Sequence, residues 1–147
     1  GRPDIILLDE PTVGLDIEER VRLKEMLEEL RGRQPIIISS HIAEDIEATC
    51  QQVIVLQKKH IIFAGEIEYL SSLATGHVWK MPEEIYRRQR NTCKQIGCIE
   101  ENGNRLVKVL CAEKECAPDV SAVPLVPRLE DGYLYLLTKD DLNEKSI

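Results

Sequence analysis

Long apolar runs are missing from this 147-residue sequence, and clusters of basic residues are missing as well. A helix that crosses a bilayer needs about 20 consecutive apolar residues, and no segment approaches that length. The net charge is −7 at pH 7, and no Lys/Arg-rich stretch with interleaved aromatic residues occurs. We therefore expect membrane contact only through a partner, and we expect no binding to nucleic acid.

The spacings typical of structural zinc sites are absent too, because the sequence has no CxxC or HxxxH pair. The cysteines number five, an odd count that does not indicate a complete disulfide framework. They are Cys50, Cys93, Cys98, Cys111 and Cys116. Two pairs share a C-x₄-C spacing, which leaves a metal site open as an alternative. We prefer reduced thiols, as in a cytosolic protein.

The most informative segment is Ile5–Thr12, with the sequence IILLDEPT. Its apolar run predicts a strand within a parallel sheet, with side chains buried on both faces of the strand. Ligands bind at the carboxyl ends of such strands, so Asp9 and Glu10 are expected at a binding site. A Mg²⁺ ion would relieve the repulsion between these carboxylates and coordinate phosphate oxygens, with Asp9 facing the metal.

The order of the expected elements indicates two domains. From residue 1 to residue 75, strands alternate with helices, which predicts an α/β domain with a parallel sheet. Its elements are a strand at Ile5–Leu8, a helix from Asp16 to Gly32, a strand at Ile36–Ile38, a helix at Ala43–Cys50, strands at Val53–Leu56 and Ile61–Ala64, and a short helix at Glu66–Ala74. The first helix begins with a D-x-x-E pattern, Asp16 to Glu19.

From residue 76 to residue 147, the pattern predicts a small α+β domain. Its elements are a strand at His77–Met81, a helix at Pro82–Gln95, a hairpin of Gly97–Glu101 and Arg105–Cys111, strands at Val120–Val126 and Gly132–Thr138, and a polar tail at Lys139–Ile147. The hairpin prediction depends on Asn102-Gly103, a strong two-residue turn signal.

Three strings in the first domain resemble those of ATP-binding cassette (ABC) ATPases. Ile5–Asp16, IILLDEPTVGLD, is similar to the Walker B segment and the D-loop of that family, and Ser39-Ser40-His41 is similar to its switch-histidine loop. Val53–Leu70 resembles the strand pair and short helix that end these cassettes. The resemblance covers about half of the chain, and it implies a P-loop NTPase-type sheet.

The resemblance also implies roles for four residues and two cofactors, ATP and Mg²⁺. Asp9 would hold the metal, Glu10 would act as the general base on the attacking water, and His41 would hydrogen-bond the terminal phosphate. Asp16 would cap a helix and also lie in the D-loop, at the interface with a second cassette.

The phosphate loop G-x-x-x-x-G-K-[ST] and the LSGGQ-like signature of this family do not occur in the sequence. By resemblance, the chain is therefore the carboxyl-terminal part of a longer ATPase, from the Walker B strand onward, and is expected to be inactive alone. The family implies an ABC transporter subunit at the cytoplasmic face of the cell membrane. Its partners would be transmembrane permease subunits and a second ATP-binding cassette.

Two alternatives stay open. One is a catalytically silent protein in which residues 76–147 form a regulatory or dimerisation module. The other is a soluble ABC-like ATPase that serves DNA repair or translation, which would predict heptad stretches or basic surfaces. The string from Ser39 to Glu47, SSHIAEDIE, resembles transporter subunits most and favours the transport function.

Overall fold

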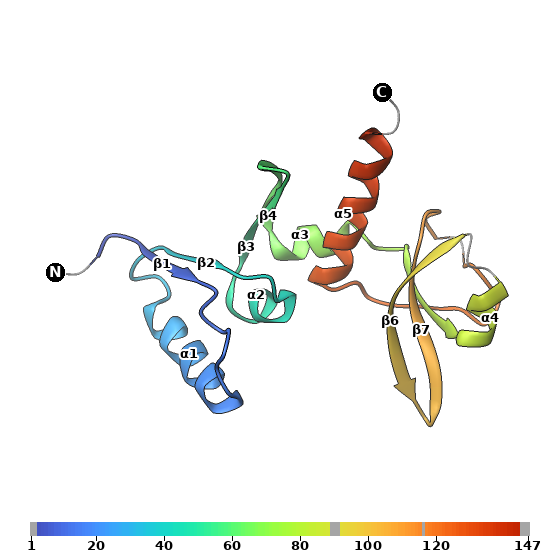
Figure 1. Cartoon of the computed structure of the whole chain (residues 1–147), viewed down its shortest axis with the longest axis horizontal. Helices are drawn as coiled ribbons and strands as arrows, with labels where there is room; N and C mark the ends of the chain where they lie inside the picture. Colours follow the sequence, from blue (N-terminus) through green and yellow to red (C-terminus); the bar gives the residue numbers. More distant parts are fainter. Residues whose placement is uncertain (1–2, 89–91, 116, 145–147) are drawn as a thin grey trace. The chain divides into compact units, whose positions relative to one another are not determined.

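A computed structural model describes residues 3–88, 92–115 and 117–144 (Figure 1). The chain forms two compact units, Gly1–Gly65 and Glu66–Ile147. Both units mix helices with small sheets, so the α/β class is confirmed at that level. The expected domain boundary after residue 75 stays a prediction. Within the described ranges, no helix has the length and apolar character needed to cross a membrane.

The first unit begins with a β-α-β arrangement, as predicted (Figure 1). Strands β1 (Ile6–Asp9) and β2 (Ile36–Ser39) pair in parallel, and helix α1 (Ile17–Leu30) connects them. The register places Asp9 opposite Ser39. The carboxyl ends of both strands therefore meet at one edge of the sheet. Helix α2 (Ala43–Thr49) follows β2 directly, and β3 (Gln52–Gln57) pairs with β4 (His60–Glu66) in a separate hairpin.

Helix α1 begins where the D-x-x-E pattern predicts. Asp16 is the N-cap, and its Oδ1 accepts a hydrogen bond from the Glu19 N–H at 2.9 Å. In return, Oε2 of Glu19 accepts from the Asp16 N–H at 3.0 Å. This capping box satisfies two N–H groups that the first turn of a helix leaves without intrahelical partners. The start of α1 is therefore fixed by local sequence.

The prediction that the first strand is buried on both faces is wrong in this structure. Leu7 of β1 is 72% exposed and Ile37 of β2 is 58% exposed, while their neighbours along each strand are partly buried. Leu27 of α1 and Ile38 of β2 line the same small pocket, so α1 covers one face of the sheet. A two-stranded sheet with one helical layer can bury only that face. Within the described residues, the parallel sheet has only these two strands, and the larger P-loop-type sheet is not formed.

The second unit is built on a four-stranded antiparallel sheet with the order β6-β7-β5-β8. Its elements are α3 (Ile67–Ser72), β5 (Val78–Pro82), α4 (Glu83–Arg88), β6 (Cys93–Glu101), β7 (Asn104–Cys111), β8 (Val123–Pro124) and α5 (Leu129–Glu144). The predicted hairpin is confirmed, since β6 and β7 pair around Asn102 and Gly103, which both have positive φ. Such φ values are typical of tight hairpin turns.

The sheet of the second unit is buried on both faces. Val78 and Leu110 pack with Ala74 on one face. A larger core cluster lies on the other face. Its buried members include Trp79, Met81, Val107 and Val109, and Ile85 and Tyr86 of α4 pack against them. The sequence places Ile85 and Tyr86 on the inner face of a helix, as the structure confirms. That helix is shorter than expected, because α4 ends at Arg88 and residues 93–95 belong to β6. Residues 89–91 of the predicted helix lie outside the described residues.

The end of the chain differs from its prediction. Gly132–Thr138 was expected to be a strand, but it lies inside helix α5, which continues to Glu144 through part of the expected polar tail. Residues 145–147 of that tail are outside the described residues. The expected strand Val120–Val126 is reduced to the two residues of β8. Contacts with other elements stabilise this segment as a helix. Helix α5 packs against α3, and Asp131 in the first turn of α5 forms an ion pair with Lys108 of β7.

Two cysteines form a disulfide, so the expectation of reduced thiols is wrong for this pair. Cys93 of β6 and Cys111 of β7 face each other across the antiparallel pair, with a Cα–Cα distance of 4.2 Å. Neither C-x₄-C spacing in the sequence predicts this pairing, because strand register brings the two residues together. Cys50 and Cys98 are free thiols, and Cys116 lies outside the described residues.

Candidate functional site

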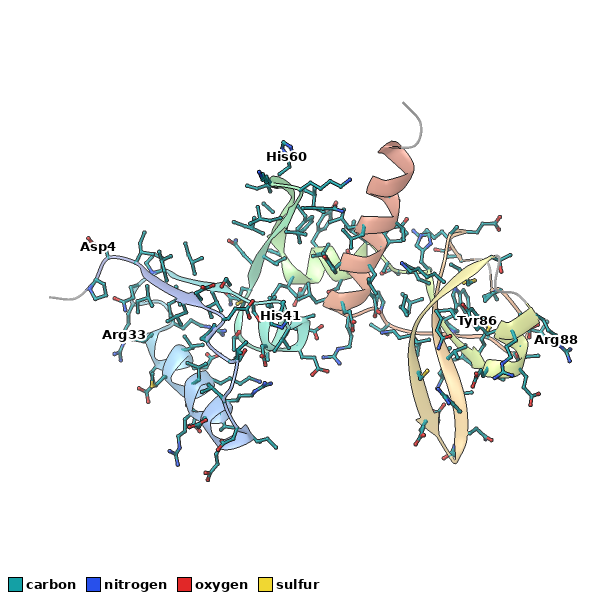
Figure 2. All side chains as sticks on the ribbon, viewed as in Figure 1. Asp4, Arg33, His41, His60, Tyr86 and Arg88 are labelled. Atoms are coloured by element: carbon teal, nitrogen blue, oxygen red, sulfur yellow. A yellow bond between two sulfur atoms is a disulfide. The ribbon has the colours of Figure 1, made fainter. Side chains whose placement is uncertain are left out.

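Polar side chains gather where β1 and β2 end. Asp9 is the last residue of β1, Glu10 follows it, and Ser39 is the last residue of β2. His41 lies two residues beyond Ser39, just before α2 (Figure 2). The parallel register brings these residues to one edge of the sheet, although they come from segments about 30 positions apart.

Glu10 and His41 are in direct contact. Nδ1 of His41 lies 2.9 Å from Oε1 of Glu10, which is the distance of a hydrogen bond. The His41 side chain is largely exposed, and the Glu10 side chain is about half as exposed. The contact leaves Nε2 of His41 as the ring nitrogen that can reach a ligand. Glu10 and His41 are therefore adjacent in space.

Ser39 links the two carboxylate residues. Its Oγ donates a hydrogen bond to Oδ1 of Asp9 and accepts one from the Glu10 N–H at 3.1 Å. The Glu10 N–H also lies 3.0 Å from the Ser39 carbonyl oxygen. In the sequence, Ser39 stands out only as part of the Ser39-Ser40-His41 string, which gives it no role. Its position at the end of a strand parallel to the Asp9 strand is a signal that could have found it.

The backbone of Glu10 is held in an uncommon conformation. Its φ is +45°, in the left-handed region that residues other than glycine seldom adopt. Its N–H bonds to Ser39, and its carbonyl oxygen accepts a hydrogen bond from the Val13 N–H at 3.1 Å. These contacts turn the chain sharply after β1. The turn keeps the Glu10 side chain at the edge of the sheet.

The second carboxylate oxygen of Glu10 has no hydrogen-bond partner among the described residues. This oxygen, Oε2, is buried. Buried polar atoms are normally satisfied, so this oxygen fits a group that the protein itself does not supply. Mg²⁺ prefers oxygen ligands and usually takes only one or two carboxylates from a protein, with water and phosphate completing its shell. Asp9 supplies such a carboxylate, and the buried Oε2 of Glu10 fits a water molecule.

In the part of the chain that the structure describes, no larger metal cluster accompanies these two acids. Within residues 3–88, 92–115 and 117–144, no group of three or more His, Cys, Asp or Glu side chains could hold a metal ion. The cysteines therefore do not assemble a metal site in the described ranges. A cation held by Asp9 would depend on water and phosphate oxygens for much of its coordination.

Asp16 lies apart from this group in its contacts. Its side chain caps α1 through the Glu19 N–H. The helix-capping role inferred from the sequence is confirmed, and the interface role stays a prediction.

A small pocket beside the site lies between α1, α2 and the turn after β1, and Thr12, Leu27 and Ile38 help to line it. Asp9, Glu10 and His41 are not among its lining residues, so this pocket belongs to the packing of the helices.

Comparisons with known proteins agree with the motifs, although no protein-family model matches the chain. The chain is 44% identical over 69 residues to the ABC transporter ATP-binding protein NatA of Bacillus subtilis (strain 168), covering 46% of the chain and 28% of that protein. It is 28% identical over 154 aligned positions to the probable multidrug ABC transporter ATP-binding protein YbhF of Escherichia coli (strain K12), covering 93% of the chain and 26% of the relative.

An archaeal relative gives a similar result. The uncharacterized ABC transporter ATP-binding protein MJ1023 of Methanocaldococcus jannaschii is 30% identical over 141 residues, covering 90% of the chain and 45% of the relative. The chain thus spans less than half the length of each of these three relatives. All three carry the same family description, and the resemblance of this chain to the carboxyl-terminal part of ABC transporter ATPase subunits is thereby confirmed.

Proposed function

We propose that this chain supplies the catalytic edge of an ATP-hydrolysing subunit of an ABC-type membrane transporter, in which hydrolysis is coupled to substrate movement. The observation that carries the proposal is the meeting of Asp9, Glu10 and His41 at the ends of two adjacent parallel strands. The descriptions of the relatives as ABC transporter ATP-binding proteins support it. The subunit would act at the cytoplasmic face of the cell membrane, bound to permease subunits.

Each residue of the edge has a chemical role in this proposal. A bound Mg²⁺ ion would supply positive charge that offsets the negative charge developing on the transferred phosphoryl group. Asp9 would hold the cation, and Glu10 would orient and deprotonate the attacking water through its carboxylate. His41 already contacts Glu10 through Nδ1, so its Nε2 would be directed to the terminal phosphate.

The D-loop residue acts outside this edge. Asp16 would meet a second cassette while it caps α1, so that hydrolysis at one site is sensed at the other. Because the sequence has no phosphate loop, the chain alone would be inactive, and the complete ATPase would supply the remaining phosphate contacts. Residues 76–147 would form a separate carboxyl-terminal domain of that subunit.

The experiment is a Glu10→Gln substitution in the complete ATPase that carries this segment. We expect ATP binding to be kept and turnover to fall at least ~10²-fold, the scale of a lost general base. The matched control is Glu25→Gln, the same chemical change at an exposed position of α1. Steady-state hydrolysis by the Glu10→Gln protein at the rate of the control would refute the role proposed for Glu10.

A further inference from the structure

Ser39 stands between the two acids of the candidate site, and its role is not covered by the motif resemblance. We propose that Ser39 is a positioning residue, which orients the Asp9 carboxylate for the cation and fixes the turn that presents Glu10. The inference rests on the proposed function and deepens it. It adds Ser39 to the catalytic edge formed by Asp9, Glu10 and His41, on the basis of two hydrogen bonds.

The direction of each hydrogen bond is set by chemistry. A serine hydroxyl has one proton to donate and two lone pairs to accept with. The Glu10 N–H can only donate, so it occupies a lone pair of Ser39 Oγ at 3.1 Å. The hydroxyl proton is then free for Oδ1 of Asp9, which accepts it. A hydrogen bond to an ionised carboxylate is stronger than one between neutral groups.

This bond has a geometric consequence for Asp9. With Oδ1 held by Ser39, the carboxylate plane is restrained and Oδ2 is left for the cation. Asp9 is otherwise an exposed side chain at a strand end, where several rotamers are accessible in water. Groups that hydrogen-bond a metal-ligating carboxylate typically change metal affinity or activity about 10- to 100-fold when they are removed.

The same hydroxyl supports the left-handed turn at Glu10. That residue has φ +45°, and its N–H is shared between Oγ and the carbonyl oxygen of Ser39. A Ser39→Ala change removes only the first acceptor, because the bond to the carbonyl oxygen at 3.0 Å does not involve the side chain. The β1–β2 pairing should therefore survive the substitution. The loss would be confined to the orientation of Asp9 and Glu10.

The test uses the complete ATPase in two backgrounds, with Glu10 intact and with Glu10→Gln to prevent turnover. In the second background, Mg²⁺ is titrated calorimetrically into the ATP-loaded protein, which measures binding without hydrolysis. The variants are Ser39→Ala, Ser39→Thr and the control Ser72→Ala. Ser72 is exposed in α3, and its hydroxyl donates only to the nearby Tyr69 carbonyl oxygen.

We expect Ser39→Ala to raise the Mg²⁺ concentration for half-saturation about tenfold and to leave the affinity for metal-free ATP unchanged. Ser39→Thr should return the value to within about threefold of the parent, because threonine keeps the hydroxyl and suits a strand. Ser72→Ala should match the parent. A merely structural role for Ser39 would lower protein stability without this selective effect on the metal.

The measurements distinguish failure of the role proposed for Ser39 from failure of the proposed ATPase function. An unchanged Mg²⁺ requirement in Ser39→Ala, or a Ser39→Thr protein as impaired as Ser39→Ala, would overturn the positioning role while the ATPase itself remains established. Absence of hydrolysis by the parent protein with Glu10 intact would instead overturn the proposed function, and the role of Ser39 would fall with it.

Discussion

Gly132 of α5 lies directly against the backbone of Leu70 in α3. A β-carbon added at Gly132 would lie 2.0 Å from the Leu70 carbonyl oxygen and 2.6 Å from its carbonyl carbon. Real β-carbons do not approach other atoms so closely. The two helices can therefore cross at this distance only because position 132 has no side chain.

The first prediction concerns this crossing. Gly132→Ala should lower the free energy of unfolding by about 2–4 kcal/mol, since the obstacle is backbone and α5 must move away from α3. Chemical denaturation followed by Trp79 fluorescence measures the loss. Gly97→Ala is the matched control, because the nearest atom to a β-carbon there is Lys108 Cβ at 3.7 Å, an ordinary contact. Equal stability of the two variants would contradict the close crossing.

The second prediction concerns the ion pair that holds the start of α5. Nζ of Lys108 lies 2.6 Å from Oδ1 of Asp131, whose side chain is almost fully buried, and the Arg128 N–H donates to Oδ2 at 2.8 Å. Asp131→Ala would leave the Lys108 charge uncompensated and the Arg128 N–H without this acceptor. We expect a loss of about 3 kcal/mol in unfolding free energy.

The control for this pair is Glu101→Ala, which removes a similar contact near the surface. Lys80 Nζ lies 2.6 Å from Oε2 of Glu101, but the Glu101 side chain is 47% exposed. Water then replaces the lost partner, and the expected cost is about 0–1 kcal/mol. If Asp131→Ala were as mild as Glu101→Ala, the buried pair would not anchor the helix.

The third prediction concerns the disulfide. Cys93 and Cys111 close a loop with a separation of 18 residues, and both lie in the core cluster that contains Trp79. Reduction should lower the unfolding free energy by roughly 3 kcal/mol, the value expected for a loop of this size. Denaturation with and without dithiothreitol measures it, and a Cys98→Ser variant shows that the exposed free thiol takes no part. Identical curves in the two conditions would disprove a structural contribution.

The fourth prediction concerns nucleotide binding by the 147-residue chain. We expect no saturable heat when ATP·Mg²⁺ is titrated to millimolar concentration, because the sequence lacks the loop whose N–H groups and lysine cradle phosphates. Adenosine titrated under the same conditions serves as a control for weak stacking. Micromolar binding of ATP by the chain alone would mean that phosphate is held by residues other than those proposed.

The elements that could be predicted from the sequence are those whose conformation depends on neighbouring residues. The start of α1 follows from the reciprocal bonds of Asp16 and Glu19, and the β6–β7 hairpin follows from a turn that needs positive φ at Asn102 and Gly103. The sequence also placed Asp9, Glu10 and His41 near one another, because parallel strands end at a common edge. The catalytic roles of these residues stay predictions.

The elements that could not be predicted are those whose conformation depends on contacts between residues far apart in the sequence. The segment Gly132–Thr138 was predicted to be a strand, but the contacts of Gly132 with α3 and of Asp131 with β7 favour a helix. The disulfide and the role of Ser39 depend on cross-strand register, which a single sequence does not reveal. The exposure of Leu7 was missed because the strand was expected within a larger sheet.

The left-handed backbone of Glu10 implies a trade-off at that position. Holding a residue with a β-carbon at φ +45° costs on the order of 1–3 kcal/mol, whereas glycine adopts this conformation without strain. A glycine would relax the turn and remove the carboxylate at the same time. If Glu10 has the proposed catalytic role, selection for stability and selection for hydrolysis would favour different amino acids at this one position, and keeping the acid would lower the stability of the fold.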